Sequence, residues 1–336
     1  MHYSFPPEVQ LALISLQMFQ NWQEIVGQPG DFRKTGFVRI VHPNEIERLK
    51  LNVEMQRRLG AHVSVIGRNE LRELEPDWNV DDVELAEYEP DSGYGDGAGV
   101  AGDFLGAARE LGVTYLSRTQ AGSFSVDAGQ LRGVVTDQGT ISAPTVVCAT
   151  GPWTRPLFQQ AGYDLPLECE YHQVAILRNA PDMKGGGCAC IDSVTATYFR
   201  SDAHDKFLLG DFYGKRPADP DDFPQRASDE SLEEIIERAS RRIPKLAGAE
   251  VMRGVTGVYD MTPDSRPLLG KIPGIRGLYV CAGFSGIGFK ISPAIGLVMS
   301  ELLLDGQGNT VDVSAFRPHR FAERQPIKAE YEYVDD

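Results

Sequence analysis

The chain has 336 residues and a formal net charge of −15, with 42% hydrophobic and 24% charged residues. This composition is that of a folded α/β protein, long enough for one large or two medium domains. The acidic balance excludes an extended nucleic-acid partner, because binding of a phosphate backbone depends on clustered lysines and arginines.

The first half of the chain alternates between helical and β-type patterns. Apolar residues recur at helical spacing from Val9 to Val26, directly after two prolines, which predicts a core-packed helix over residues 8–26. The elements expected next are a strand over 35–41, a helix over 44–60 with Asn44 as N-cap, a strand over 62–67, a helix over 99–111 and a strand over 113–120.

The second half is richer in β-type patterns. A hairpin with its tight turn at residues 137–139 leads to a buried strand over 145–150 that ends before Gly151. Later strands are expected over 172–177, 196–200, 206–213 and 278–284, with helices over 228–242, capped by Ser228 or Asp229, and from Ser292 to Leu304.

The cysteines and histidines give no sign of a metal site. The five cysteines are an odd number without a CxxC pair, which indicates a reducing compartment, and we expect a cytoplasmic protein. Cys188 and Cys190 follow three glycines and are interpreted as a turn that enters a strand. The six histidines show no HxxH or HExxH spacing. No stretch reaches the roughly 18 apolar residues that a spanning helix requires, so no membrane span is expected.

Gly97, Gly99 and Gly102 have the GxGxxG spacing of a dinucleotide-binding turn. That motif requires a buried strand before it and an acidic residue about 20 positions later, at the end of the next strand. Here the preceding residues are acidic and turn-forming, and the expected strand 113–120 ends without a carboxylate. We therefore interpret the motif as a loop and an amphipathic helix. An NAD-dependent dehydrogenase that uses these glycines is the alternative, and a bulky residue at Gly99 would damage cofactor binding only in that case.

Residues 278–304 combine a buried strand, a glycine-rich loop and a helix. The loop has glycines at 283, 286 and 288 and a cation at Lys290, and the helix can begin with Ser292 as N-cap and Pro293 in the first position. Backbone N–H groups and the positive end of a helix can bind an anionic or electron-rich ligand. A plain strand-to-helix turn explains the pattern equally well.

Three segments carry a resemblance to a known family: "VVCATGPWT" at 146–154, "YDMTPDSRPLLG" at 259–270 and "AGFSGIGFKISPAIG" at 282–296. The sequence resembles the D-amino-acid-oxidase-like family of FAD-dependent amine oxidoreductases, most closely its sarcosine oxidase and dimethylglycine dehydrogenase branch. The opening residues 2–22 are similar to the family's helix that follows the flavin-edge loop. The resemblance therefore runs along the chain in order.

The resemblance implies roles for particular residues. Lys290 and Tyr259 match positions that line the substrate and oxygen side of the flavin ring in sarcosine oxidases, so they are the candidate catalytic residues; Tyr259 can equally be a core aromatic. Gly151 would lie near the ADP portion and Ala121 near the adenine. The remaining candidate cofactor-binding residues form the loop over the pyrimidine end of the flavin: Gly283, Phe284, Ser285, Gly286, Ile287, Gly288, Phe289 and Lys290.

The implied reaction is oxidation of the C–N bond of a small amino acid or N-methyl amino acid. Hydride transfer to the flavin would give an imine that water hydrolyses, and oxygen, a quinone or another flavoprotein would take the electrons. In monomeric sarcosine oxidases a cysteine two residues before the matching tyrosine tethers the flavin. Here Gly257 occupies that position, so the FAD is expected to be non-covalent.

The fold class expected is α/β. An FAD-binding Rossmann-like domain over 1–34, 90–165 and 263–336 would be interleaved with a mixed-sheet α+β substrate domain over 35–89 and 166–262. Family members begin with a βαβ unit that carries GxGxxG, and we expect this chain to lack roughly 40 to 60 residues, about that unit and its loop. The alternative hypothesis is a truncated or non-catalytic subunit with the same fold and no bound flavin.

Overall fold

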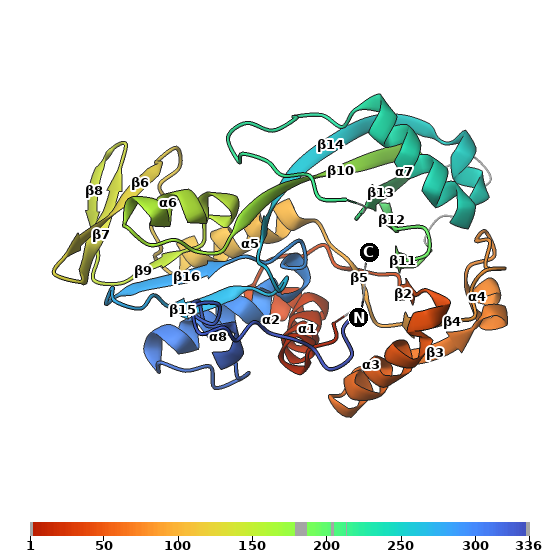
Figure 1. Cartoon of the computed structure of the whole chain (residues 1–336), viewed down its shortest axis with the longest axis horizontal. Coiled ribbons are helices and arrows are strands. Elements are labelled where there is room, and N and C mark those ends of the chain that lie inside the picture. The colour runs from red at the N-terminus through yellow and green to blue at the C-terminus, as the bar shows by residue number, and fades with distance from the viewer. Residues whose placement is uncertain (1–2, 179–186, 203–204, 213, 334–336) are drawn as a thin grey trace.

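The structure is a computed structural model and describes residues 3–178, 187–202, 205–212 and 214–333. Figure 1 shows two parts side by side, one built on a large twisted sheet and the other on smaller sheets with helices. The large sheet takes its strands from 37–89 and 168–261, whereas a three-stranded sheet takes its strands from 146–148 and 268–282. Segments of the two parts thus alternate along the chain. The exact domain boundaries given above stay a prediction.

The large sheet has eight strands in the order β14-β10-β13-β12-β11-β2-β4-β3. Every pair is antiparallel except β11 with β2, which run parallel. The strands are β2 (Phe37–Ile40), β3 (Ser64–Gly67), β4 (Leu85–Glu89), β10 (Glu168–Arg178), β11 (Ala189–Asp192), β12 (Thr197–Asp202), β13 (Lys206–Asp211) and β14 (Glu250–Met261). Cys188 and Cys190 lie where the chain enters β11, and all five cysteines are free thiols.

The two faces of this sheet differ in chemistry. One face packs against helices α4 (Arg68–Leu74) and α7 (Asp229–Arg242) through a core that includes Val38, Ala86, Leu177 and Phe199. Side chains alternate along a strand, so the neighbouring positions point to the opposite face. That second face carries charged and polar side chains: Arg39, Glu87, Glu89, His172, Tyr198, Arg200 and Tyr259. A central sheet with one polar face is typical of a sheet that borders a binding site.

The second part contains the sheet β15-β16-β9, made of β15 (Leu268–Lys271), β16 (Leu278–Ala282) and β9 (Val146–Cys148), with β9 parallel to β16. Helices α1 (Pro6–Gln20) and α8 (Ser292–Leu304) share a core with it. A separate three-stranded sheet consists of β6 (Ala121–Asp127), β7 (Gln130–Thr136) and β8 (Gly139–Ser142), and it confirms the expected hairpin. The remaining elements are α2 (Trp22–Val26), β1 (Arg33–Lys34), α3 (Ile46–Arg58), β5 (Gly93–Tyr94), α5 (Gly97–Glu110) and α6 (Thr154–Gln160), with short 3-10 helices that include Pro43–Glu45, Gly151–Trp153 and Phe289–Ile291.

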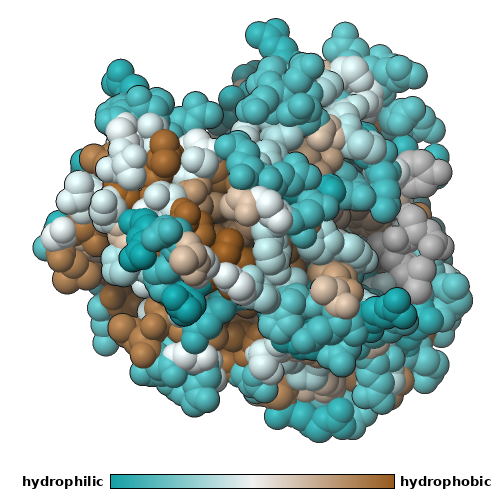
Figure 2. Space-filling view, turned by 60° about the vertical axis from the view of Figure 1, so that its left-hand side comes forward, coloured by the Kyte–Doolittle hydropathy of each residue, from teal (hydrophilic) through white to brown (hydrophobic). Residues whose placement is uncertain are grey.

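Strand β9 is the edge strand of its sheet within the described residues. Val147 on this strand is exposed, as are Leu111, Val113, Tyr115 and Leu116 on the segment after α5. Figure 2 shows apolar side chains gathered on the left-hand half of the face it presents, whereas its right-hand half is mostly polar. Exposed apolar side chains thus gather on one side of this face of the molecule.

Several sequence-based expectations about local structure were wrong. The first helix ends at Gln20, and α2 begins after Asn21, whose amide side chain donates to the carbonyl of Gln17. Asn44 lies within a 3-10 turn and caps no helix. Residues 113–120 form no strand, although their apolar residues fit one. A strand needs a neighbour to take its hydrogen bonds, and this segment has none in the described part of the chain.

The GxGxxG glycines lie in the first turns of α5, whose N-cap is Asp96. The carboxylate of Asp96 accepts the N–H groups of Ala98 and Gly99, which occupies the helix end that a dinucleotide would need. The strand before it, β5, has two half-buried residues and pairs with β1 alone. The expected loop and helix are confirmed, and the geometry of a dinucleotide turn is absent at this position.

Candidate active site

The glycine-rich loop after β16 is held by the end of β14. The N–H of Gly283 donates to the carboxylate of Asp260 at 2.5 Å, and the N–H of Ser285 donates to the carbonyl of the same residue at 3.0 Å. Gly283, Ser285 and Gly286 have φ angles of +76°, +51° and +82°. These residues, in the left-handed conformation, turn the chain sharply at the end of β16. The loop thus has a defined shape set by two strands far apart in sequence.

Tyr259 lies directly beneath this loop. A Cβ atom at Gly286 would be 2.6 Å from a ring carbon of Tyr259, so only glycine fits there. The tyrosine ring stacks on His172 with ring centroids 4.1 Å apart, and its hydroxyl hydrogen-bonds that of Tyr198. Burial raises the pKa of Tyr259 and lowers that of His172. Three strands of the large sheet, β10, β12 and β14, therefore bring two phenols and a neutral imidazole together under the loop.

Lys290 ends the loop at the start of α8. Burial lowers the pKa of its ammonium group to about 8, although Glu89 nearby favours the charged form. The ammonium nitrogen lies 5.2 Å from the centroid of the Tyr3 ring. Ser292 is the first residue of α8 rather than its N-cap, because its hydroxyl donates back to the carbonyl of Phe289.

Lys290 borders a cavity of about 240 Å³ between the two parts of the molecule. The polar residues on its wall include Glu89, Tyr94, Arg200 and Lys290. The other lining residues are largely apolar or small: Ala12, Leu16, Phe19, Phe32, Phe37, Gly93, Gly95, Gly286, Ile287 and Phe289, with Ser92 among them. The cavity is thus an apolar chamber with charged groups of both signs on its wall.

The structure brings together some of the expected site residues and leaves others apart. Gly286, Ile287, Phe289 and Lys290 line the cavity, with Tyr259 beneath the loop. Phe284 turns into the neighbouring core, where its own Cβ atom lies 2.8 Å from the position of a Cβ at Gly288. Gly151 follows β9 with a φ of +52° and open space where a Cβ would be.

Ala121 is exposed at the start of β6, in a different sheet from the loop. Neither Ala121 nor Gly151 lines the cavity. Their assignment to the ADP portion of the cofactor stays a prediction.

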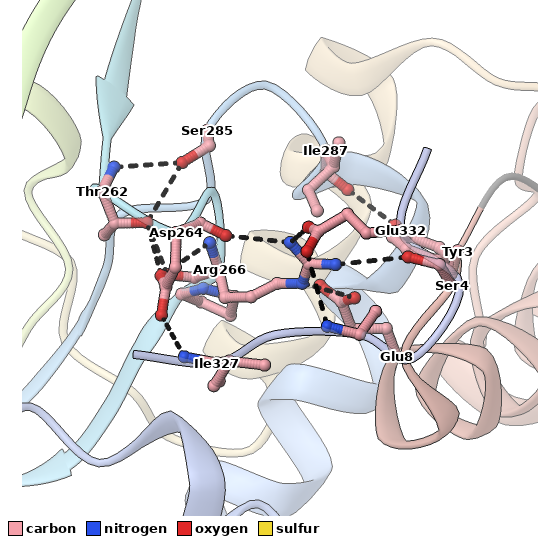
Figure 3. A network of polar contacts seen from close by, with 12 residues as sticks. Tyr3, Ser4, Glu8, Thr262, Asp264, Arg266, Ser285, Ile287, Ile327 and Glu332 are labelled. Atoms are coloured by element: carbon pink, nitrogen blue, oxygen red, sulfur yellow. Dashed lines mark hydrogen bonds and ion pairs between the residues drawn. The ribbon is translucent and has the colours of Figure 1, made fainter. Parts of the chain in front are cut away.

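A buried ion network stands behind the loop (Figure 3). Arg266 lies 3.1 Å from the carboxylate of Glu8 and 2.6 Å from that of Glu332. Asp264 accepts two N–H groups from Arg320, at 2.7 and 2.9 Å. Because Glu332 belongs to the C-terminal tail and Glu8 to α1, the network ties both ends of the chain to the turn between β14 and β15 that carries Asp264 and Arg266.

Two further contacts link this network to the loop itself. The hydroxyl of Tyr3 donates to the carbonyl of Ile287 at 2.9 Å, and the hydroxyl of Ser285 accepts the N–H of Thr262 at 3.1 Å. Figure 3 shows these contacts on either side of Arg266. The conformation of the loop therefore depends on residues near both termini.

His172, Tyr198, Arg200 and Glu89 were not identified from the sequence as site residues. Each occupies an ordinary position in a strand, and its side chain faces the site only because of the register of that strand. Polar residues at alternate positions of a strand are the one signal that could have identified them.

The donor set at the loop suits a flavin. The pyrimidine edge of an isoalloxazine carries electron-rich oxygen and nitrogen atoms, and the loop offers a cation and the N-terminal end of the thirteen-residue helix α8. One N–H of that helix, of Ala294, is already bound by the hydroxyl of Ser15. The strand, glycine-rich loop and helix thus fit the isoalloxazine end of FAD.

Comparison with known proteins decides the family. The profile described as FAD dependent oxidoreductase (DAO) matches residues 1–302. The chain belongs to this family. Its cofactor is accordingly FAD, and the resemblance noted in the sequence is confirmed.

Individual relatives are similar over almost the whole chain. The FAD-dependent oxidoreductase domain-containing protein 1 of Xenopus laevis is 26% identical over 368 residues, which cover 97% of this chain and 72% of that protein. The mitochondrial dimethylglycine dehydrogenase of Rattus norvegicus is 23% identical over 338 residues, 95% of this chain and 39% of that protein. This chain therefore spans well under half of the rat dehydrogenase.

Solved structures show the same fold. L-proline dehydrogenase from P. horikoshii superposes with a TM-score of 0.89 at 27% identity, covering 97% of this chain and 86% of that one. Glycine oxidase from Geobacillus kaustophilus gives 0.81 at 23% identity, with 95% and 84% covered. The mixed α/β fold expected from the sequence is confirmed.

Proposed function

We propose that this FAD-dependent oxidoreductase oxidises the C–N bond of a small amino acid or N-methyl amino acid. The observation that carries the proposal is the cavity of about 240 Å³ bordered by Lys290. It lies between the glycine-rich loop and the polar face of the large sheet. The printed names of relatives, which include dimethylglycine, proline and glycine enzymes, support a substrate of this size and chemistry.

The residues around the loop have separate tasks in this reaction. FAD, when bound, supplies a two-electron acceptor. Lys290 would stabilise negative charge at the pyrimidine end of the flavin, because its ammonium group lies on the loop in a largely apolar environment. Gly257 offers no thiol, so we propose that the FAD is held non-covalently.

We propose that His172, which stacks on Tyr259 beneath the loop and outside the lining of the cavity, takes up the proton that the substrate nitrogen releases. Its Nε2 atom is buried and makes no hydrogen bond within the described residues, and its lowered pKa keeps the imidazole neutral. The amine would lose a hydride equivalent from carbon to the flavin and a proton from nitrogen to His172. Water would then hydrolyse the resulting imine.

The proposal extends to the setting of the reaction. The electron acceptor would be oxygen, a quinone or another flavoprotein, and we propose a cytoplasmic location on the basis of the free cysteines. Among the helices of the described residues, none has the length and apolar character needed to cross a membrane.

The test uses the purified full chain mixed with FAD. A shifted and structured flavin absorption band would report binding, and anaerobic addition of sarcosine, dimethylglycine, glycine, L-proline or a D-amino acid should bleach it. A well-folded chain that is colourless once unbound FAD has been removed would favour the alternative of a non-catalytic subunit. Bound FAD that none of these amines reduces would refute the proposed substrate class.

A further inference from the structure

We propose that Asp260 is the positioning residue of the glycine-rich loop. Its buried carboxylate occupies the anion site formed by the N–H groups of the first half of the loop, residues 283–285, and thereby fixes how the second half, residues 286–290, faces the flavin. The inference concerns the cofactor loop and is independent of the substrate proposed above. None of the site residues expected from the sequence was Asp260.

The two halves of the loop have different surroundings. Four residues of the second half line the cavity: Gly286, Ile287, Phe289 and Lys290. Residues 283–285 are not among its lining residues. A Cβ atom at Gly283 would lie 2.5 Å from the side chain of Thr262 and 2.9 Å from that of Leu167. The first half is thus a closely packed anchor, and the second half is the part that a flavin in the cavity would contact.

Asp260 binds the first half through its side chain and its backbone. Its carboxylate accepts the N–H of Gly283 at 2.5 Å and also that of Phe284, and its carbonyl accepts the N–H of Ser285 at 3.0 Å. Ser285 has a φ of +51°, a conformation that costs a non-glycine residue energy unless its surroundings hold it there. The contacts with Asp260 supply that constraint.

The carboxylate of Asp260 has no cation to balance it. The residue is 8% exposed, and no ion pair joins it to a basic side chain in the described part of the chain. Its titratable neighbours Cys169 and Cys281 are thiols, and burial, with Asp260 among the further causes, raises the pKa of both. Burial also raises the pKa of Asp260, whereas the N–H groups of Gly283 and Phe284 oppose that rise. Loop and carboxylate therefore stabilise each other.

This arrangement divides the positive potential of the loop between two anions. Successive backbone N–H groups form an anion site, and here Asp260 fills it from within the chain. A flavin in the cavity would therefore depend on Lys290 and on the N-terminal end of α8 for positive potential. Removing the carboxylate should leave an empty anion site and a loop that no longer holds one conformation.

The test compares the full chain with D260A in the presence and absence of formate. We expect D260A to weaken FAD binding by about tenfold or more and to lower the melting temperature of the FAD-free chain by about 2–6 °C, because charge-assisted hydrogen bonds are lost. Formate can replace the missing carboxylate and should restore both, whereas formamide and chloride at the same concentration should not. D127A is the matched control, because Asp127 is exposed on β6 and pairs with Arg132; it should equal the wild type.

D260N separates position from charge. Its amide oxygen can still accept the N–H of Gly283, so its melting temperature should fall less than that of D260A. One negative charge beside the loop is removed, so the midpoint potential of bound FAD should rise in D260N. Formate should have no effect on this variant, because its side chain fills the site.

Two results would overturn the inference. The first is a lower melting temperature in D260A and D260N with unchanged FAD affinity and midpoint potential, which is what a purely structural residue would give. The second is a defect in D260A that formate does not repair, or that chloride repairs equally well.

Two further measurements keep the inference testable. If D260A does not fold, D260N decides, and wild-type affinity and potential in D260N refute the role of Asp260. If the wild-type chain binds no FAD, the effect of formate on the melting temperature of D260A decides. No amine is added in these experiments, so a failure here is distinguishable from a failure of the proposed function.

Discussion

Replacing Glu8 by glutamine isolates the contribution of the ion network behind the glycine-rich loop. Glu8 is 1% exposed and Arg266 is 6% exposed, and the network holds three carboxylates, of Glu8, Asp264 and Glu332, against the two guanidinium groups of Arg266 and Arg320. One negative charge is therefore in excess. Burial raises the pKa of Glu8 to about 7, against the opposing effect of Arg266, so Glu8 is the carboxyl that takes up a proton.

The raised pKa of Glu8 sets the sign and the size of its pH-dependent contribution to the free energy of unfolding. The unfolded chain releases the proton of Glu8 near its ordinary pKa of 4.5, whereas the folded chain holds it to about pH 7. The contribution of the protonated Glu8 carboxyl to the free energy of unfolding is therefore complete below pH 4.5 and is lost as the pH rises to about 7. For these two pKa values, the contribution of Glu8 to the free energy of unfolding falls by about 2.5 kcal/mol as the pH rises from 5 to 8. Glutamine does not titrate, so E8Q should lack this component.

Urea denaturation at pH 5 and pH 8 measures the difference. The free energy of unfolding of E8Q, relative to the wild type, should rise by about 2.5 kcal/mol from pH 5 to pH 8. E24Q, at an exposed position in α2, is the control and should follow the wild type at both values. A relative stability of E8Q that is independent of pH, or that falls with pH, would refute the reasoning about the excess charge.

Three further predictions concern the loop and the residues beneath it. G286A should lower the melting temperature and weaken FAD binding, at a cost of about 1–3 kcal/mol, because the new Cβ would lie 2.6 Å from the Tyr259 ring. The control is G296A, at an exposed position within α8 with open space around it, which should stabilise the protein by about 0.5–1 kcal/mol. Equal effects of the two substitutions would contradict the steric argument. The midpoint potential of bound FAD should show a pH-dependent step near 8, where Lys290 loses its charge, and K290M should lack that step; its persistence in the variant would assign it to another group. H172F keeps the aromatic stack but not the imidazole, so flavin reduction by substrate should slow by about 10²–10⁴-fold with little change in melting temperature, whereas an unchanged rate would remove this histidine from the reaction.

Much of the local structure was predictable from the sequence. The segment from 278 to 304 forms the expected strand, loop and helix, and α7 begins where Ser228 caps it, its hydroxyl accepting the N–H of Ser231. These features depend on residues adjacent in the chain. The strand expected over 113–120 is absent because a strand depends on a neighbouring strand, and the described residues supply none there.

The sequence by itself determined the family, the cofactor and the glycine-rich loop, because these depend on contiguous residues whose backbone conformation and charge are local properties. Only the tertiary structure decided which polar side chains meet that loop. Arg200 and His172 look ordinary in their strands. The register that turns Arg200 toward the cavity and stacks His172 on Tyr259 is set by hydrogen bonds to strands elsewhere in the sequence. A one-residue shift in that register would send both side chains to the apolar face beneath α7, which is why pairing between strands, and not the residue types alone, forms the candidate site.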